Sequence, residues 1–256
     1  AEHVAGSEAA FVQRMNERAQ ELGMVNTHFV NCTGLDDGAD AGEHLTTARD
    51  IAIMSRELLG HEKIKEYTTI WMDTVRDGQF GLSNTNKLVR FYDGTTGLKT
   101  GYTSSAGYCL SASAERGGME LIAVVMHCKT SPDRFESAKA LLNYGFANYA
   151  IVDPMENVTL EQVPVVLGKQ DFVEVEPEGA GTVLLDKALA GSVTCTAELD
   201  ESVQAPVKKG QQLGTLRVEA GGKVLREIEL VAAEAVPALG FFDIWKQMLG
   251  TVCMAG

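Results

Sequence analysis

The sequence predicts an α+β domain over residues 1–150, a small all-β domain over residues 151–236 and a C-terminal amphipathic helix over residues 237–256. Two observations define the first domain: apolar residues recur at helical spacing near its beginning and its end, and strand patterns separated by turn signals lie between them. A third observation defines the second domain, because short apolar runs alternate with turn residues from 151 to 235 and no helical period occurs there.

The N-terminal segment is predicted to be helical. Phe11, Met15 and Leu22 recur at helical spacing, and Gly23 ends the run. The opening residues 1–6 have no cap residue before them, so they are interpreted as a helix already in progress. We therefore expect the natural chain to extend upstream.

A second helix and a strand are predicted next. Thr47 is the expected N-cap, with Asp50 three residues on in a capping-box pattern, and Gly60 ends the helix. Residues 67–75 have a strand pattern, and Asp77-Gly78 marks a turn after it.

The rest of the first domain is predicted to be a hairpin followed by a long helix. Strands are expected over residues 107–114 and 119–127, with a turn at residues 116–118 between them. Ser131 is the expected N-cap of the helix and Pro132 its first residue. The apolar stripe of this helix is Phe135, Ala138, Leu141, Leu142, Gly145, Phe146 and Tyr149.

The second domain and the C-terminus complete the prediction. Strands are expected over residues 163–167, 181–186, 192–197, 214–218 and 223–231, with a hairpin turn at Gly221-Gly222. After Pro237 an amphipathic helix is expected, because Phe241, Trp245, Met248 and Val252 share one face. Such a helix either lies in a membrane interface or packs on its own domain.

Composition and spacing exclude several classes of function. The net charge of −13 argues against nucleic-acid binding, which requires a basic surface. The histidines show no HExxH motif and the cysteines no CxxC motif, so neither a metal nor a cofactor is predicted. The widely spaced cysteines are interpreted as buried free thiols: Cys32, Cys109, Cys128, Cys195 and Cys253.

The tripeptide Lys99-Thr100-Gly101 is the one motif that indicates a chemistry. Lys-Thr-Gly belongs to the signature of β-lactamases and penicillin-binding proteins. On a strand edge it supplies an ammonium and a hydroxyl for a substrate carboxylate, while the glycine lets the substrate lie close. Three common residues also occur together by chance, in which case they form a strand end with a turn glycine.

A longer pattern around the tripeptide resembles a known family. Residues 84–88 (Asn-Thr-Asn-Lys-Leu), 93–94 (Asp-Gly), 96–103 and 106–108 resemble the low-molecular-weight D-Ala-D-Ala carboxypeptidases. Further similar segments are residues 1–7, 22–31, 34–36, 46–50 and 121–126. The resemblance implies that the first domain is the C-terminal part of a penicillin-binding, β-lactamase-like transpeptidase domain, with the small β domain and terminal helix appended.

The resemblance also implies an activity and a set of site residues. A serine would attack the carbonyl between two D-alanines of a peptidoglycan stem peptide, and β-lactams would acylate the same serine. Lys99 would be catalytic, and the Tyr102 backbone N–H would form half of the oxyanion hole. The substrate-binding residues would be Thr100, Gly101, Thr103 and Arg134. The alternative for Arg134 is a solvated helix arginine.

The nucleophile is missing from the sequence. No serine has lysine three residues on, and Ser83-Asn84 places its asparagine one position too early for Ser-x-Asn. Both motifs would lie upstream of residue 1, so we expect a truncated or nicked chain that is inactive alone and binds its own missing N-terminal segment.

Location and alternatives follow from the same resemblance. The protein is expected at the extracytoplasmic face of the bacterial cell membrane, in peripheral contact with it through the terminal helix. One alternative is a β-lactamase, which would lack the appended β domain. The other is a non-catalytic wall-binding relative, which only the missing nucleophile favours.

Overall fold

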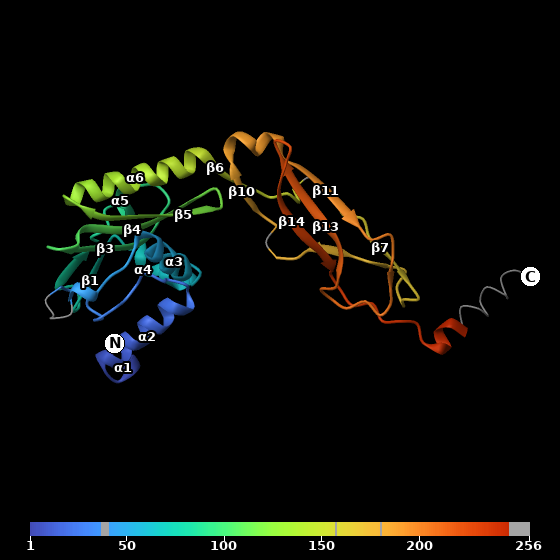
Figure 1. The fold of residues 1–256 in the computed structure, drawn as a ribbon, viewed down its shortest axis with the longest axis horizontal. Coiled ribbons are helices and arrows are strands. Elements are labelled where there is room, and N and C mark those ends of the chain that lie inside the picture. Colours follow the sequence, from blue (N-terminus) through green and yellow to red (C-terminus); the bar gives the residue numbers. More distant parts are fainter. Residues whose placement is uncertain (37–40, 157, 180, 246–256) are drawn as a thin grey trace, which may run out of the picture. The chain divides into compact units, whose positions relative to one another are not determined.

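The computed structural model describes residues 1–36, 41–156, 158–179 and 181–245. The chain divides into two compact units, Ala1–Ala147 and Asn148–Gly256 (Figure 1). Helices surround a sheet in the first unit, whereas the second is built from strands. The predicted fold class, an α+β unit followed by an all-β unit, is confirmed.

The first unit contains short and long helices and five strands. In chain order they are α1 (Glu2–Ala5), α2 (Glu8–Glu21), η1 (Ala41–Glu43), α3 (Ala48–Leu59), η2 (Glu62–Ile64), α4 (Lys65–Thr68), β1 (Met72–Val75), β2 (Phe80–Ser83), α5 (Leu88–Phe91), β3 (Thr95–Thr103), β4 (Gly107–Arg116), β5 (Met119–Cys128) and α6 (Ser131–Asn148).

The N-terminal segment is helical, as predicted, and consists of two helices. Gly6 ends α1 in the left-handed conformation, with φ of 81°. Ser7 then caps α2, because its hydroxyl accepts the Ala10 N–H at 3.2 Å. A glycine followed by serine thus combines a stop signal with a start signal.

The second predicted helix is confirmed as α3, and its cap is the expected one. The Thr47 hydroxyl accepts the Asp50 N–H at 3.1 Å. The strand expected over residues 67–75 is only partly correct, because Tyr67 lies in α4 and the strand begins at Met72. β1 pairs with β2 in a separate two-stranded ribbon.

Strands β3, β4 and β5 form the central sheet of the first unit, and the predicted hairpin between β4 and β5 is confirmed. Side chains of β4 alternate between its two faces. Leu110 and Ala112 pack on Phe135 of α6, whereas Ser111 faces α3, where its hydroxyl bonds that of Ser55 at 2.8 Å. The sheet therefore lies between α6 and α3 (Figure 1).

Helix α6 begins one residue earlier than predicted. The Thr130 hydroxyl accepts the Asp133 N–H at 3.3 Å, and the Asp133 carboxylate accepts the Thr130 N–H at 3.0 Å. This reciprocal pair is a capping box, so Thr130 and not Ser131 is the cap. The shift leaves Pro132 in the first turn, where its missing N–H costs nothing.

The second unit contains three sheets. Its elements are β6 (Tyr149–Val152), β7 (Val163–Val166), β8 (Phe172–Val173), β9 (Val175–Pro177), β10 (Val183–Asp186), η3 (Lys187–Ser192), β11 (Thr194–Leu199), β12 (Val203–Gln204), β13 (Gln212–Ala220) and β14 (Lys223–Ala232). The sheet orders are β11-β13-β14-β9, β12-β7-β8 and β10-β6. The five predicted strands are present with shifted ends, and the short strands β6, β8, β9 and β12 were not predicted.

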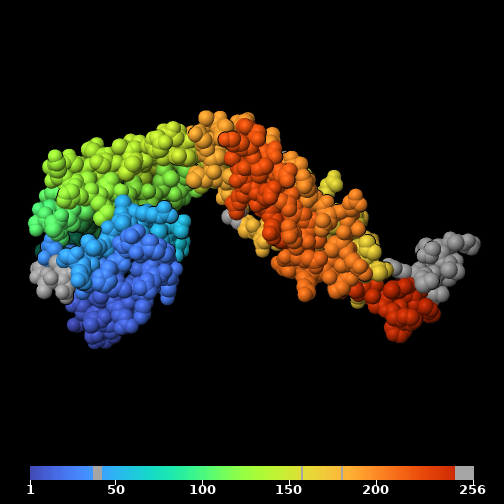
Figure 2. Space-filling model, viewed as in Figure 1, coloured from blue at the N-terminus to red at the C-terminus, as the bar shows by residue number. Residues whose placement is uncertain are grey.

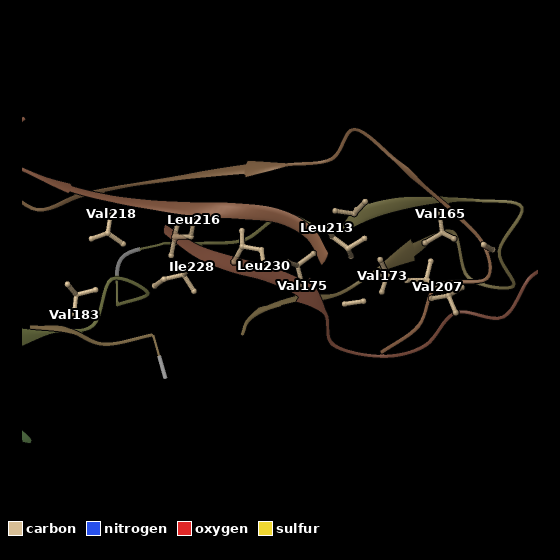
Figure 3. Packing of buried hydrophobic residues seen from close by; sticks show 14 residues of the cluster. Val165, Val173, Val175, Val183, Val207, Leu213, Leu216, Val218, Ile228 and Leu230 are labelled. Atoms are coloured by element: carbon tan, nitrogen blue, oxygen red, sulfur yellow. The ribbon is translucent and has the colours of Figure 1, made fainter. Parts of the chain in front are cut away.

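The core of the second unit is a continuous row of aliphatic side chains. Figure 3 shows it extending from Val183 and Val218 at one end to Val165, Val173 and Val207 at the other. Alternate residues of the strands point into it, which is the period-2 pattern of a sheet with one buried face.

The C-terminal helix begins later than predicted. Residues 237–240 are not helical, and this segment pairs with the residues that follow β7. Lys169 N–H donates to the Pro237 carbonyl, and Leu239 N–H donates to the Leu167 carbonyl. Residues 241–245 are helical, and residues 246–256, with Met248 and Val252 of the predicted apolar face, lie outside the described residues. No helix within the described residues combines the length and apolar character that crossing a membrane requires.

Candidate functional site

The Lys99-Thr100-Gly101 motif lies in β3, at the edge of the central sheet. β3 pairs with β4 on one side, with Lys99 opposite Ser111, and no strand covers its other side among the described residues. An open strand edge presents backbone N–H and C=O groups that can pair with an extended peptide. The expectation of an edge-strand motif is therefore correct.

The two polar side chains of the motif have different environments. The Thr100 side chain is buried, and its hydroxyl bonds the Thr85 hydroxyl at 2.7 Å. The Lys99 side chain is exposed, and its ammonium donates to the Thr100 carbonyl. A strand alternates its side chains, so these two groups lie on opposite faces of β3.

Asn86 joins the segment before the motif to β3, and the sequence analysis gave it no role. Its side chain is fully buried. Its amide donates to the Gly97 carbonyl at 2.9 Å, and its side-chain oxygen accepts the Leu88 N–H at 3.2 Å. The segment Asn84-Thr85-Asn86 in the sequence could have indicated this role, because Thr85 and Asn86 both bond residues of β3.

Arg134 is not a solvated helix arginine. It is 7% exposed, and its guanidinium donates to the Gly101 carbonyl at 3.0 Å and to the Cys109 carbonyl at 3.3 Å. The rings of Tyr108 and Phe135 lie 5.4 and 4.9 Å from its guanidinium carbon, within the range of cation–π contact. A permanent cation is therefore held against the end of the motif.

The charge of Arg134 is incompletely compensated. Burial lowers the pKa of its guanidinium, although an arginine remains protonated at neutral pH. Among the described residues, its buried Nε has no hydrogen-bond partner. A desolvated cation with an unused donor is a suitable neighbour for an anionic group.

The remaining predicted residues, Tyr102 and Thr103, are the last two residues of β3. The Thr103 hydroxyl accepts the Ala106 N–H at 3.0 Å, so its oxygen also stabilises this turn. The Ser105 hydroxyl donates to the Asp36 carboxylate at 2.5 Å, and this bond lowers the pKa of Asp36. The exposed Tyr102 ring lies 4.3 Å from that of Tyr108, its partner across the strands.

The cysteines and histidines form no site of their own. The four described cysteines are free, but Cys32 is exposed, so the prediction that all are buried is wrong; Cys253 lies outside the described residues. The Cys32 thiol donates to Glu8, which raises its pKa. In the described part of the chain, no three His, Cys, Asp or Glu side chains are grouped as metal ligands.

Comparison with known proteins defines the class. The family model for D-alanyl-D-alanine carboxypeptidases of peptidase family S11 matches residues 1–130, and that for the C-terminal domain of penicillin-binding protein 5 matches residues 155–238. The D-alanyl-D-alanine carboxypeptidase DacF of Bacillus subtilis is 39% identical over 98% of this chain. The chain spans 64% of the length of that relative.

Solved structures agree with this assignment. Penicillin-binding protein 5 from Haemophilus influenzae has a TM-score of 0.73 and 30% identity, covering 92% of this chain and 68% of that one. Penicillin-binding protein D2 from Listeria monocytogenes, solved in its cefotaxime-bound form, is 36% identical, with a TM-score of 0.50 over 54% of this chain and 56% of its own. The fold is that of a penicillin-binding protein with an appended β unit. The chain belongs to the D-alanyl-D-alanine carboxypeptidase family.

Proposed function

We propose that the whole protein is a serine-type carboxypeptidase that removes the terminal D-alanine from peptidoglycan stem peptides and that β-lactams acylate it. The observation that carries this proposal is the Lys99-Thr100-Gly101 edge strand with the buried Arg134 cation bonded to Gly101. The β-lactam-bound relative from Listeria monocytogenes supports the β-lactam part.

The reaction has two steps. A serine oxygen attacks the carbonyl of the penultimate D-alanine, its proton passes to the departing amine, and the amide C–N bond breaks to release D-alanine. Water then hydrolyses the serine ester and restores the hydroxyl. A β-lactam acylates the serine quickly, but the resulting ester is hydrolysed slowly, because the leaving group of the opened ring remains attached to the acyl group.

Residues of β3 bind the substrate in this proposal. The stem peptide adds to the open edge of β3, where Gly101 has no side chain to obstruct it. The Thr100 hydroxyl, held by Thr85, bonds the terminal carboxylate, with Thr103 as a further contact. The Tyr102 backbone N–H donates to the oxyanion of the tetrahedral intermediate.

Two cations act on the same substrate. Lys99, exposed on β3, supplies positive potential at the reacting serine and takes part in proton transfer. Arg134 acts on the substrate carboxylate from behind Gly101, to whose carbonyl it is bonded. A cation desolvated by burial attracts an anion more strongly than one in water does.

The nucleophile comes from outside these residues. Neither Ser-x-x-Lys nor Ser-x-Asn occurs in the 256 residues. We infer that another segment of the protein supplies both motifs and docks on the first unit. The protein works at the extracytoplasmic face of the bacterial membrane, which it contacts through the helix that begins at Phe241.

Labelling with a fluorescent penicillin tests the proposal. The protein purified from the cells that make it is expected to carry label on a denaturing gel and to release D-alanine from a D-Ala-D-Ala peptide. Residues 1–256 expressed alone are expected to do neither. D-alanine release by that chain alone would show that the nucleophile is within it.

Single substitutions in the native protein test the site. Lys99→Met is expected to lower labelling at least about a hundredfold, in the range found for groups acting on the transition state. The control is Lys63→Met, another exposed lysine of the same unit, which should label normally. A native protein that never labels would instead be the non-catalytic wall-binding relative.

A further inference from the structure

The end of the β unit that carries β7 and β8 exposes apolar side chains that no strand or helix covers in the described residues. Leu167 is 54% exposed and Phe172 is 52% exposed. Leu167 follows β7, two residues after the core residue Val165, and Phe172 directly precedes the core residue Val173 in β8. Leu167 also has a φ of 59°, a strained conformation for a non-glycine residue, and such strain often occurs at functional positions.

The chain brings further apolar side chains to this end. Leu239 N–H donates to the Leu167 carbonyl at 2.8 Å, and two residues later Phe241 and Phe242 are 77% and 80% exposed. Trp245 follows at 55% exposure. Figure 2 shows the described part of this segment, in red, at the end of the β unit. The aromatic residues therefore directly follow a segment that is hydrogen-bonded to the β7–β8 turn.

Lysines border the apolar side chains. The Lys169 ammonium lies 3.5 Å from the Asp243 carboxylate, which ties the β7–β8 turn to the start of the helix. Lys208 and Lys209 directly follow Val207, which pairs with Val236 one residue before Pro237. Both are exposed and form no ion pair among the described residues.

This combination fits the surface of a lipid bilayer. Aromatic rings with lysines beside them are favoured where hydrocarbon meets headgroups, because each side chain has an apolar part and a polar end. Three carboxylates, Asp171, Glu234 and Asp243, also lie in these segments, and the chain has a net charge of −13. Burial of apolar side chains, rather than attraction between charges, would therefore provide most of the affinity for the bilayer.

We propose that the β7–β8 turn and the Lys208–Lys209 loop form a second lipid-binding surface, contiguous with the helix that begins at Phe241. Leu167 and Phe172 enter the interface, and the lysines contact anionic headgroups. A single amphipathic helix can rotate about its own axis, whereas a second contact made by the β unit would limit how that unit turns against the bilayer. The inference rests on the proposed membrane location, but it requires no turnover.

Vesicle sedimentation of residues 1–256 tests it, with vesicles of phosphatidylcholine alone or with about a third phosphatidylglycerol. Leu167→Glu should lower partitioning about tenfold or more, because it puts a charge in place of an apolar side chain that the bilayer would bury. The control is Leu184→Glu: Leu184 is 60% exposed and follows Val183 at the opposite end of the core. This control should bind like the parent chain.

The lysine contribution is separable. Lys208→Gln combined with Lys209→Gln should weaken binding to the anionic vesicles by several-fold, with little change on phosphatidylcholine alone. Equal binding of Leu167→Glu and the parent chain would overturn the proposal. So would an effect of Leu167→Glu on self-association alone, which would make this end an interface between copies. Failure of the parent chain to bind vesicles, with the native protein still labelled by penicillin, would refute only this inference. Vesicle binding with no labelling of the native protein would refute only the carboxypeptidase.

Discussion

Replacing Asn86 with alanine should loosen β3 selectively. The buried side chain makes two hydrogen bonds, to the Gly97 carbonyl and from the Leu88 N–H. Gly97 and Leu88 are themselves buried, so water cannot easily replace the lost partner. An unpaired buried polar group costs about 1–3 kcal/mol, which gives about 3 kcal/mol for the pair.

Hydrogen exchange read by mass spectrometry measures this cost locally. At about 1.4 kcal/mol for each factor of ten, amides of residues 95–103 should exchange about a hundredfold faster in Asn86→Ala. The matched control is Lys87→Ala, at the adjacent exposed position, which should change exchange less than about threefold. Exchange in Asn86→Ala within threefold of the parent chain would refute the view that Asn86 holds the motif strand in place.

Two further predictions concern stability. Burial, with a smaller contribution from His28, lowers the pKa of His44, whose Nδ1 accepts the Val30 N–H at 3.5 Å. The unfolded chain therefore binds a proton at His44 more readily than the folded chain does, so acid should destabilise the first unit. The urea midpoint of that unit should fall as the pH is lowered from about 7.5 to about 5.5, and it should fall less in His44→Asn. An equal fall of the midpoint in both proteins would contradict this. Leu216 is buried in the core of the second unit, so Leu216→Ala should lower the free energy of unfolding of that unit, measured by calorimetry, by about 3 kcal/mol. Leu184 is exposed, so Leu184→Ala should leave this free energy nearly unchanged. Equal losses in the two variants would contradict the placement of Leu216 in the core.

Local signals explain which parts of the fold could be predicted. The Gly117-Gly118 and Gly221-Gly222 turns use positive φ angles that glycine adopts readily, so these hairpins follow from adjacent residues. The break between α1 and α2 was not predicted, because the apolar spacing that indicates the helix begins only at Phe11. There the local pair Gly6-Ser7 ends one helix and caps the next.

The motif could be found in the sequence, but its supports could not. Lys99, Thr100 and Gly101 are consecutive, so the motif can be recognised from the sequence alone. Thr85 reaches Thr100 across 15 positions, and Asn86 reaches Gly97 across 11. These separations follow no helical or strand period, because the chain returns to β3 through the short helix α5 and the turn after it.

The role of Arg134 could not be decided from its residue type and its position in the sequence. Its place early in α6 suits both a solvated arginine and a substrate-binding one, and the difference lies in Gly101 and Cys109, far away in sequence. Their carbonyls hold the guanidinium in place, so in the proposed site no binding energy would be spent on immobilising a long side chain when a carboxylate binds. Burial also removes water that would weaken an attraction between this cation and an anion, and the Nε itself is buried without a partner in the described residues. The contacts that Arg134 makes with the end of β3 would therefore also position this cation for the anionic substrate proposed above.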